Sequence, residues 1–263
     1  MPSTMKTWIN TGDIEMTSTA RLGDSFDRLS DVELANAINA VFLEPMKHYQ
    51  PLYAVPTVVE DSDMPLIRYV SSAVLQIIDP NQYGGIPRSS TLYALISMVH
   101  NWSQATDSPS AAVRVVFFDY RKAFDLIDHN LLARKIEALD MPRWVRVRVL
   151  DFLSDRKQRV RLSSDCRSEW GSVPGGVPQG TKLGPWLFLL MINDLEVDAL
   201  TWKYVDDTTI AQTIPRGLTS DVQSAVSAVE AWSIENRMEQ NADKCKEMRI
   251  DFKKNTQFST NCD

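Results

Sequence analysis

The run VRVVFFDY at residues 113–120 constrains the fold most, because it is almost continuously apolar and rich in β-branched and aromatic residues. Such a run is typical of a central β-strand that is buried on both faces. The apolar stretch ends abruptly at Asp119. A carboxyl group at the end of a buried strand is either a simple turn residue or part of a site at the edge of a sheet. This segment alone leaves both alternatives open.

Two adjacent carboxylates, Asp206 and Asp207, stand between short segments with strand character, KYV and TTI. Burying two like charges side by side is costly, so one interpretation is a β-hairpin with a solvated turn. The alternative is a turn that holds a divalent cation, since Mg²⁺ is bound by one or two carboxylates plus substrate phosphates. If the strand ending at Asp119 is a neighbour, three carboxylates converge. Two Mg²⁺ ions about 3.5–4 Å apart could then serve phosphoryl transfer, as in polymerases and some nucleases.

Apolar spacing and turn residues predict the remaining elements. The predicted helices cover residues 32–46, 68–78, 90–104, 128–139, 142–153, 182–195 and 221–238. In the helix at 90–104, the apolar residues that share one face are Leu92, Leu95, Ile96 and Val99. The predicted strands are 113–120, 157–162, 168–173, the hairpin around Asp206 and Asp207, and 247–252. This order predicts an α+β fold of the split βαβ, ferredoxin-like type, with a mixed sheet and helices on one face.

The domain organisation expected from the sequence is linear. Residues 1–66 are predicted to be poorly ordered, with one helix and a Pro-rich, acidic linker. Residues 67–255 form the main domain and 256–263 a tail. Hydrophobic residues make up 44% and charged residues 24%, which is typical of a soluble globular protein with no membrane association. Three scattered cysteines indicate a reducing, intracellular setting, in the nucleus or the cytoplasm or both.

Charge is unevenly distributed along the chain. The net charge of −6 is not that of a typical nucleic-acid-binding protein. Residues 143–162, however, carry seven Arg or Lys residues against two Asp. Four of them could follow a nucleic-acid backbone by neutralising phosphates, namely Arg156, Lys157, Arg159 and Arg161. The alternative is an ordinary solvated basic hairpin.

Five segments of the chain occur in the order and roughly the spacing of the reverse transcriptase palm. They are QYGGIPRSST, FFDYRKAFDLIDH, GVPQGTKLGPWLFLLMINDL, KYVDD and NADKCKEMRIDF. Each alone is a weak signal, but five in order are strong. Over about residues 79–252 the chain resembles the reverse transcriptases of non-LTR (LINE-type, jockey-like) retrotransposons. The resemblance implies a polymerase palm that adds dNTPs to a DNA primer along an RNA template, with no obligate protein partner.

The same resemblance implies roles for individual residues. It assigns metal binding to Asp119, Asp206 and Asp207 and to the backbone carbonyl of Tyr120, which implies two Mg²⁺ ions with Mn²⁺ as a substitute. It assigns nucleotide binding to Ala123, Phe124, Gln179, Gly180 and Lys244.

Three of these assignments have a physical rationale beside a plainer alternative. The ring of Phe124 resembles a gate that excludes a 2′-OH by volume, and its alternative is a core aromatic. Gln179 with Gly180 resembles the motif beside the nascent base pair, and its alternative is a simple strand-to-helix loop. Lys244 resembles the lysine that helps to protonate the pyrophosphate leaving group, and its alternative is a solvated surface lysine.

The sequence also departs from the family pattern. No R-P-I-S-like stretch precedes QYGGIPRSST, and little sequence follows EMRIDF at 247–252. The expected structure is therefore a palm with partial fingers and without a thumb. Two functions stay open: an RNA-directed DNA polymerase, which the intact carboxylates favour, and a retrotransposon remnant without enzymatic activity, which the missing motifs and low bulk charge favour. A two-metal nuclease shares the carboxylates but does not explain PQG beside YVDD.

Overall fold

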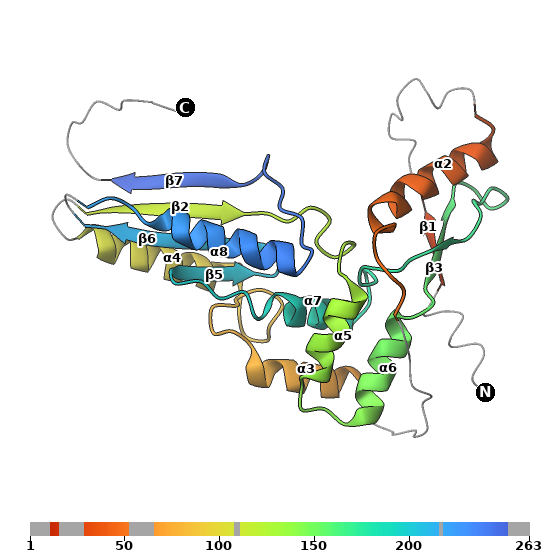
Figure 1. Ribbon diagram of the computed structural model, residues 1–263, viewed down its shortest axis with the longest axis horizontal. Coiled ribbons are helices and arrows are strands. Elements are labelled where there is room, and N and C mark those ends of the chain that lie inside the picture. Colours follow the sequence, from red (N-terminus) through yellow and green to blue (C-terminus); the bar gives the residue numbers. More distant parts are fainter. Residues whose placement is uncertain (1–10, 16–28, 53–65, 108–110, 216–217, 252–263) are drawn as a thin grey trace. The chain divides into compact units, whose positions relative to one another are not determined.

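The structure, a computed structural model, describes residues 11–15, 29–52, 66–107, 111–215 and 218–251 (Figure 1). The chain divides into two compact units, each built from two stretches that are distant in sequence. The first unit comprises Met1–Gln76 and Phe124–Met191, and the second comprises Ile77–Ala123 and Ile192–Asp263. The linear domain boundaries predicted from the sequence do not follow this division. The predicted tail and most of the predicted linker lie outside the described residues.

The second unit is built on a four-stranded sheet with the strand order β5-β6-β2-β7. In it β2 (Ala112–Phe118) lies between β6 (Asp207–Ile214) and β7 (Lys246–Asp251), and β5 (Leu200–Tyr204) is at the edge beside β6. The predicted central strand is therefore confirmed. All three strand pairs are antiparallel, so the prediction of a mixed sheet is wrong.

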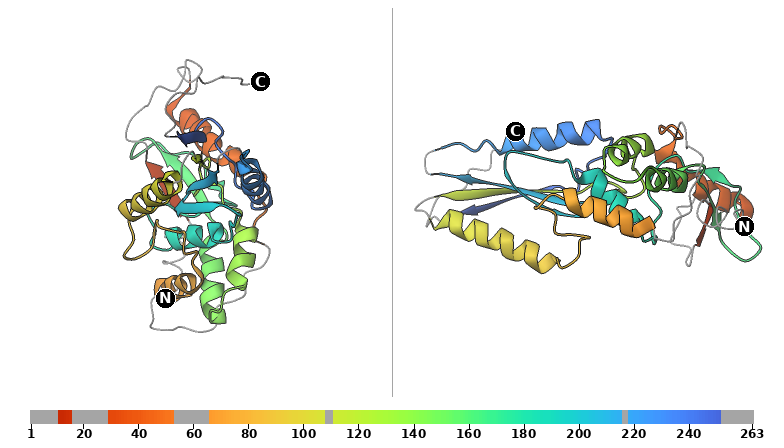
Figure 2. Two further views of the ribbon diagram at one scale, coloured as in Figure 1. Left: turned by 90° about the vertical axis from the view of Figure 1, so that its left-hand side faces the viewer. Right: turned by 90° about the horizontal axis from the view of Figure 1, so that it is seen from below.

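Two helices cover this sheet from opposite sides. In the views of Figure 2, α4 (Thr91–Thr106) and α8 (Val222–Glu235) lie on opposite faces of the sheet. On one face, Met98 and Trp102 pack against a cluster that includes Val113. The prediction of helices on one face is wrong because β2 is apolar on both faces and needs a cover on each.

The helix α4 packs on the sheet through an unexpected face. Ser90 caps the helix, since its side chain accepts a hydrogen bond from the backbone N–H of Tyr93. The apolar face marked out by the sequence is instead more than half exposed at each position, namely Leu92, Leu95, Ile96 and Val99. The residues that contact the sheet cluster are Met98, Trp102 and Ala105. Helical periodicity alone did not distinguish these two apolar faces.

The first unit combines helices with a small second sheet. Its elements are α2 (Asp31–Leu43), η1 (Glu44–Met46), α3 (Leu66–Ile77) up to Gln76, α5 (His129–Glu137), α6 (Arg143–Leu153), α7 (Gly184–Ile192) up to Met191, β1 (Thr11–Glu15), β3 (Lys157–Arg161) and β4 (Gly171–Ser172). Asp128 caps α5 through hydrogen bonds from the N–H groups of Asn130 and Leu131. No described helix is long and apolar enough to cross a membrane.

One strand of the small sheet was not expected. The sequence predicted a single helix and otherwise poor order within residues 1–66, yet β1 forms there and pairs in parallel with β3. On its other side β3 pairs antiparallel with β4, which confirms the predicted basic hairpin. The polar segment TGDIE has little strand propensity of its own. Its pairing partner lies more than a hundred residues further along the chain, so no local pattern indicated the strand.

Candidate active site

The sheet of the second unit brings three carboxylates to one end. Asp119 directly follows β2, and Asp206 lies in the turn between β5 and β6, just before Asp207. Phe118 pairs with Thr208 across β2 and β6, so the end of β2 lies beside the start of β6. The convergence expected if the two strands were neighbours therefore occurs.

Asp119 is held by a short loop that also carries a lysine. Its backbone carbonyl accepts a hydrogen bond of 2.8 Å from the N–H of Asn241. Its carboxylate Oδ2 lies 3.5 Å from Nζ of Lys244, whose side chain is 67% exposed. The other carboxylate oxygen, Oδ1, is buried and has no hydrogen-bond partner among the described residues. A buried carboxylate oxygen without a partner is unfavourable unless a ligand satisfies it.

The negative charge around Asp207 also favours a bound ligand of positive charge. Its pKa is raised above the ordinary value, first by loss of hydration and then by the negative charges of Asp206 and Asp119, while Lys244 opposes the rise. Within the described part of the chain, no group of three or more His, Cys, Asp or Glu side chains is close enough to hold a metal ion. The excess negative charge and the unpartnered Oδ1 of Asp119 nevertheless fit a cation that substrate phosphates help to bind.

Comparison with known proteins identifies the family. Residues 64–259 match the family model described as reverse transcriptase (RNA-dependent DNA polymerase). The chain belongs to the reverse transcriptase family. It is 29% identical over 184 residues to the RNA-directed DNA polymerase from mobile element jockey of Drosophila melanogaster, which covers 65% of this chain and 20% of the relative.

Further relatives place this reverse transcriptase among non-LTR elements. It is 31% identical over 150 residues to the probable RNA-directed DNA polymerase from transposon X-element of Drosophila melanogaster, covering 56% of this chain and 16% of that relative. The chain therefore spans about a fifth or less of the curated relatives that it matches. A telomerase from Candida tropicalis, solved with a fragment of telomeric RNA, shares the fold with a TM-score of 0.51 at 13% identity, over 70% of this chain and 33% of that one. The palm-like fold of a reverse transcriptase is thus confirmed.

The side chain of Tyr120 in this reverse transcriptase packs against helix α8. Its hydroxyl lies 3.3 Å from Oγ of Ser233, and its ring packs edge-on against Trp232. Burial raises the pKa of Tyr120 to about 12. Tyr120 and Gln240 form an antiparallel β-bridge. The two hydrogen bonds of this bridge are accepted by the carbonyls of Glu239 and Asp119. The role predicted for Tyr120 concerned its backbone carbonyl, which neither of these bonds uses.

The predicted nucleotide-binding residues are divided between the two units. Ala123, which is buried, and Lys244 belong to the second unit, and Phe124, Gln179 and Gly180 belong to the first. The half-buried ring of Phe124 stacks on Phe188, with centroids 4.5 Å apart and planes 17° apart, which is compatible with both the core-aromatic and the gate alternatives. Gly180 has φ +76°, a backbone conformation that favours glycine, and no atom lies within 4 Å of the position of a Cβ.

Asp125 has a contact that sequence reasoning missed. Its Oδ1 accepts a hydrogen bond of 3.0 Å from the side-chain amide of Gln179. Because this bond holds the amide nitrogen of Gln179, the carbonyl oxygen of the same amide points in a defined direction. No local signal in the sequence links these two residues, which are 54 positions apart.

The four predicted nucleic-acid-binding residues differ in environment. Arg156 is largely buried and donates a hydrogen bond of 3.1 Å to the carbonyl of Gly176, and burial lowers its pKa to about 10. The guanidinium of Arg159 lies 4.3 Å from the ring centroid of the exposed Trp170. Lys157 is exposed, and Arg161 is half-buried. Arg156 therefore contacts the turn at Gly176, and its role in nucleic-acid binding stays a prediction.

A buried histidine beside Arg156 makes stability depend on pH. Nε2 of His129 donates a 2.6 Å hydrogen bond to the carbonyl of Gly176, and burial lowers the pKa of His129 from 6.5 to about 4. Between these pH values the unfolded chain takes up a proton that the folded chain does not, so acidification favours unfolding. We expect the free energy of unfolding to fall by about 1.5 kcal/mol between pH 6.5 and pH 5 because of this residue.

Urea denaturation at both pH values tests this expectation. His129→Gln keeps an amide donor for the Gly176 carbonyl but cannot titrate, so it should remove that part of the pH dependence. The exposed His100 provides the matched control. His100→Gln should leave the pH dependence unchanged, and equal effects of the two variants would contradict the assignment.

Proposed function

We propose that this chain is the polymerase domain of a non-LTR retrotransposon reverse transcriptase and that it catalyses RNA-directed DNA synthesis. The observation that carries the proposal is the convergence of Asp119, Asp206 and Asp207 at one end of the palm sheet, with Lys244 at 3.5 Å from Asp119. The substrates that we propose are an RNA template, a DNA primer and dNTPs, in agreement with the names of its relatives, which are RNA-directed DNA polymerases.

The three carboxylates and the Tyr120 carbonyl would hold two divalent cations, Mg²⁺ or Mn²⁺. When bound, such ions lower the pKa of the attacking hydroxyl and neutralise the charge that develops on the phosphates. The unpartnered Oδ1 of Asp119 and the raised pKa of Asp207 support an electronegative site of this kind. Asp206 in the hairpin turn and Asp207 at the start of β6 would face the primer end in this proposal.

Lys244 is the proposed proton donor to the leaving pyrophosphate. Its Nζ is paired with Oδ2 of Asp119 but is largely exposed, so it can exchange protons with solvent. The ammonium form of lysine carries the proton that a general acid requires. The basic residues Lys157, Arg159 and Arg161 are proposed contacts for the template or the primer.

For the nucleotide, we propose contacts from Gln179, Gly180, Phe124 and Ala123. Gln179 would lie beside the nascent base pair, with its amide fixed by Asp125. The open space around Gly180 would let the backbone approach a substrate closely. Phe124 would exclude a 2′-OH by volume while it packs on Phe188.

Primer extension tests the proposed activity. Purified protein is given poly(rA) with oligo(dT), dTTP and either Mg²⁺ or Mn²⁺, beside an Asp206→Ala/Asp207→Ala variant. We expect cation-dependent extension that the variant lacks. Extension that persists in the variant would contradict the assigned carboxylates. Absence of extension from folded, monodisperse protein would favour the alternative of an inactive remnant.

The proposed gate makes a separate prediction about sugar selectivity. Phe124→Val should raise the efficiency of ribonucleotide incorporation relative to deoxyribonucleotide incorporation, on the order of 10- to 100-fold, because the smaller side chain leaves room for a hydroxyl. Competition between rUTP and dTTP in the extension assay measures this ratio. Phe124→Tyr keeps the ring and should keep the selectivity. An unchanged ratio in Phe124→Val would leave Phe124 as a core residue.

A further inference from the structure

The turn that carries Asp206 has a strained backbone. Val205 and Asp206 connect β5 to β6, with Tyr204 paired to Asp207. Val205 has φ +61°, in the left-handed region. A two-residue hairpin turn with positive φ at its first central position normally has glycine there, and a β-branched residue is strongly disfavoured. Such strain persists only where surrounding contacts fix the conformation.

The contact that fixes this turn comes from Gln82. Its side chain is 2% exposed, and its Oε1 accepts hydrogen bonds of 3.2 Å from the N–H groups of both Val205 and Gly84. Gly84 permits this approach because it has no side chain. A Cβ at that position would lie only 2.6 Å from the backbone nitrogen of Val205.

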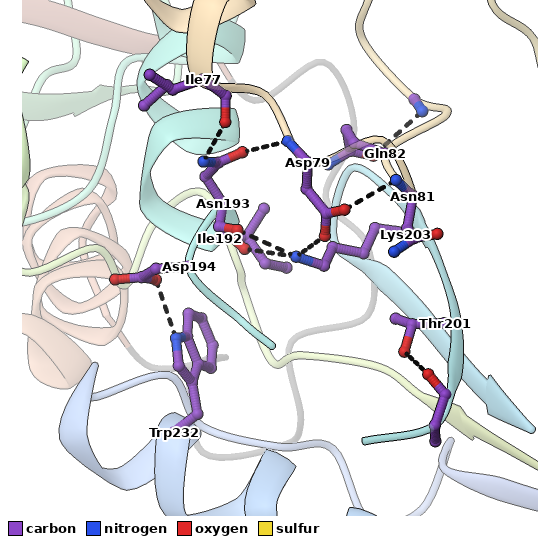
Figure 3. A network of polar contacts seen from close by, with 12 residues as sticks. Ile77, Asp79, Asn81, Gln82, Ile192, Asn193, Asp194, Thr201, Lys203 and Trp232 are labelled. Atoms are coloured by element: carbon purple, nitrogen blue, oxygen red, sulfur yellow. Dashed lines mark hydrogen bonds and ion pairs between the residues drawn. The ribbon is translucent and has the colours of Figure 1, made fainter. Parts of the chain in front are cut away.

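The segment that carries Gln82 is anchored to the same hairpin. The N–H of Tyr83 donates to the carbonyl of Lys203, and the N–H of Lys203 donates to the carbonyl of Asn81, each at 2.8 Å. The side chain of Lys203 is fully buried, with Nζ 2.6 Å from Oδ2 of Asp79 (Figure 3). The segment from Asp79 to Gly84 therefore contacts β5 through backbone and side chain alike.

We propose that Gln82 is a positioning residue, which holds the strained turn at Val205 and thereby places Asp206 and Asp207. The consequence for catalysis rests on the proposed polymerase function, but the positioning itself can be measured without activity. One buried amide oxygen, that of Gln82, thus keeps the two neighbouring carboxylates in a fixed orientation.

Hydrogen exchange of the turn is the direct test. Gln82→Met has a side chain of similar length without the acceptor oxygen. It should accelerate amide exchange in a peptide spanning 202–208 by roughly tenfold, the expected effect of losing a hydrogen bond. Exchange across β2 should stay unchanged.

The matched control is Gln212 at the other end of β6. Its Oε1 also accepts two hydrogen bonds, from Oγ of Ser220 at 2.8 Å and from the N–H of Asp221 at 2.9 Å. Gln212→Met makes the same chemical change far from the turn and should leave exchange at 202–208 unaffected. Equal exchange at 202–208 in wild type and Gln82→Met would overturn the proposal.

Relief of the strain provides the second test. Glycine adopts φ +61° freely, so in the Val205→Gly background the loss of Gln82 should matter less. In primer extension, Gln82→Met should lower kcat by roughly tenfold with little change in KM for the dNTP, and by less than about threefold in the Val205→Gly background. If Gln82→Met does not fold, Val205→Gly should restore folding. A double variant that also fails to fold would overturn the proposal.

The two hypotheses can fail separately. Faster exchange in Gln82→Met, from a wild type that does not extend primers, would support the positioning role and refute the polymerase function. Normal exchange in Gln82→Met, with an active wild type, would refute the positioning role alone. A loss of kcat in Gln82→Met that Val205→Gly does not reduce would also count against it, because a general packing defect behaves in that way.

Discussion

Replacing Asp79 with asparagine is expected to lower the free energy of unfolding by about 3–5 kcal/mol, the cost of leaving one charge of a buried pair uncompensated. The ammonium group of Lys203 is fully buried, and its charged partner is Oδ2 of Asp79 at 2.6 Å. Its other contacts, at 3.3 and 3.2 Å, are the uncharged carbonyls of Ile192 and Asn193 (Figure 3). Two carbonyls cannot replace both the hydration and the counter-charge of a buried ammonium group.

A double-mutant cycle tests whether this effect belongs to the pair. Lys203→Met alone should also destabilise the protein, since it leaves the Asp79 carboxylate with little besides the N–H of Asn81. The double variant Asp79→Asn/Lys203→Met carries no buried charge at this position and should be closer to wild type than either single variant. Urea denaturation at pH 7 measures all four proteins.

An exposed ion pair in the same sheet is the matched control. Arg114 and Glu247 connect β2 to β7, and their side chains are 31% and 48% exposed. Glu247→Gln should lose only about 0.2–1 kcal/mol, as is usual for surface pairs. Equal losses for Asp79→Asn and Glu247→Gln would contradict the view that Lys203 is held as a buried cation.

Asp207→Asn is expected to reduce polymerase activity while it stabilises the metal-free protein. Activity should fall by at least roughly 10²- to 10³-fold, the scale on which one electrostatic group at a reacting centre matters. The gain in stability follows from the raised pKa of Asp207. Above that pKa the folded state carries a carboxylate that partial burial and two neighbouring negative charges disfavour. Asparagine removes the charge and the repulsion.

The same change at Asp243 is the control for this prediction. Its side chain is 91% exposed, and its carboxylate lies 3.9 Å from the guanidinium of Arg121. Asp243→Asn should alter neither activity nor stability appreciably. Melting temperatures in EDTA and in excess Mg²⁺ separate the two effects, since Mg²⁺ should stabilise wild type more than Asp207→Asn. A destabilised Asp207→Asn protein in EDTA would contradict the account.

Much of the palm was predictable because its signals are local. The apolar run of β2 predicted a central strand, and its end at Asp119 left a turn residue and the edge of a site as alternatives. Strand-forming residues on both sides of Asp206 and Asp207 predicted the hairpin. Asp128 before an apolar helical pattern predicted the cap that the structure contains. Each of these features depends on residues within a few positions of one another.

The supporting contacts could not be predicted because their partners are distant in sequence. Lysine is usually solvated, so nothing in KYVDD indicated that Lys203 is buried. The hydrogen bond from Val205 to Gln82 joins residues 123 positions apart. Arg156 looked like a phosphate contact, although it packs against the turn at Gly176. Composition indicates which residues are charged, but only the tertiary fold determines which charges are buried.

The most direct test of the central claim is extension of a DNA primer on an RNA template of mixed sequence, followed by sequencing of the product. The account predicts DNA complementary to the RNA, made only with Mg²⁺ or Mn²⁺ and absent from Asp206→Ala/Asp207→Ala. Folded protein that binds the primer–template but makes no complementary DNA would contradict it.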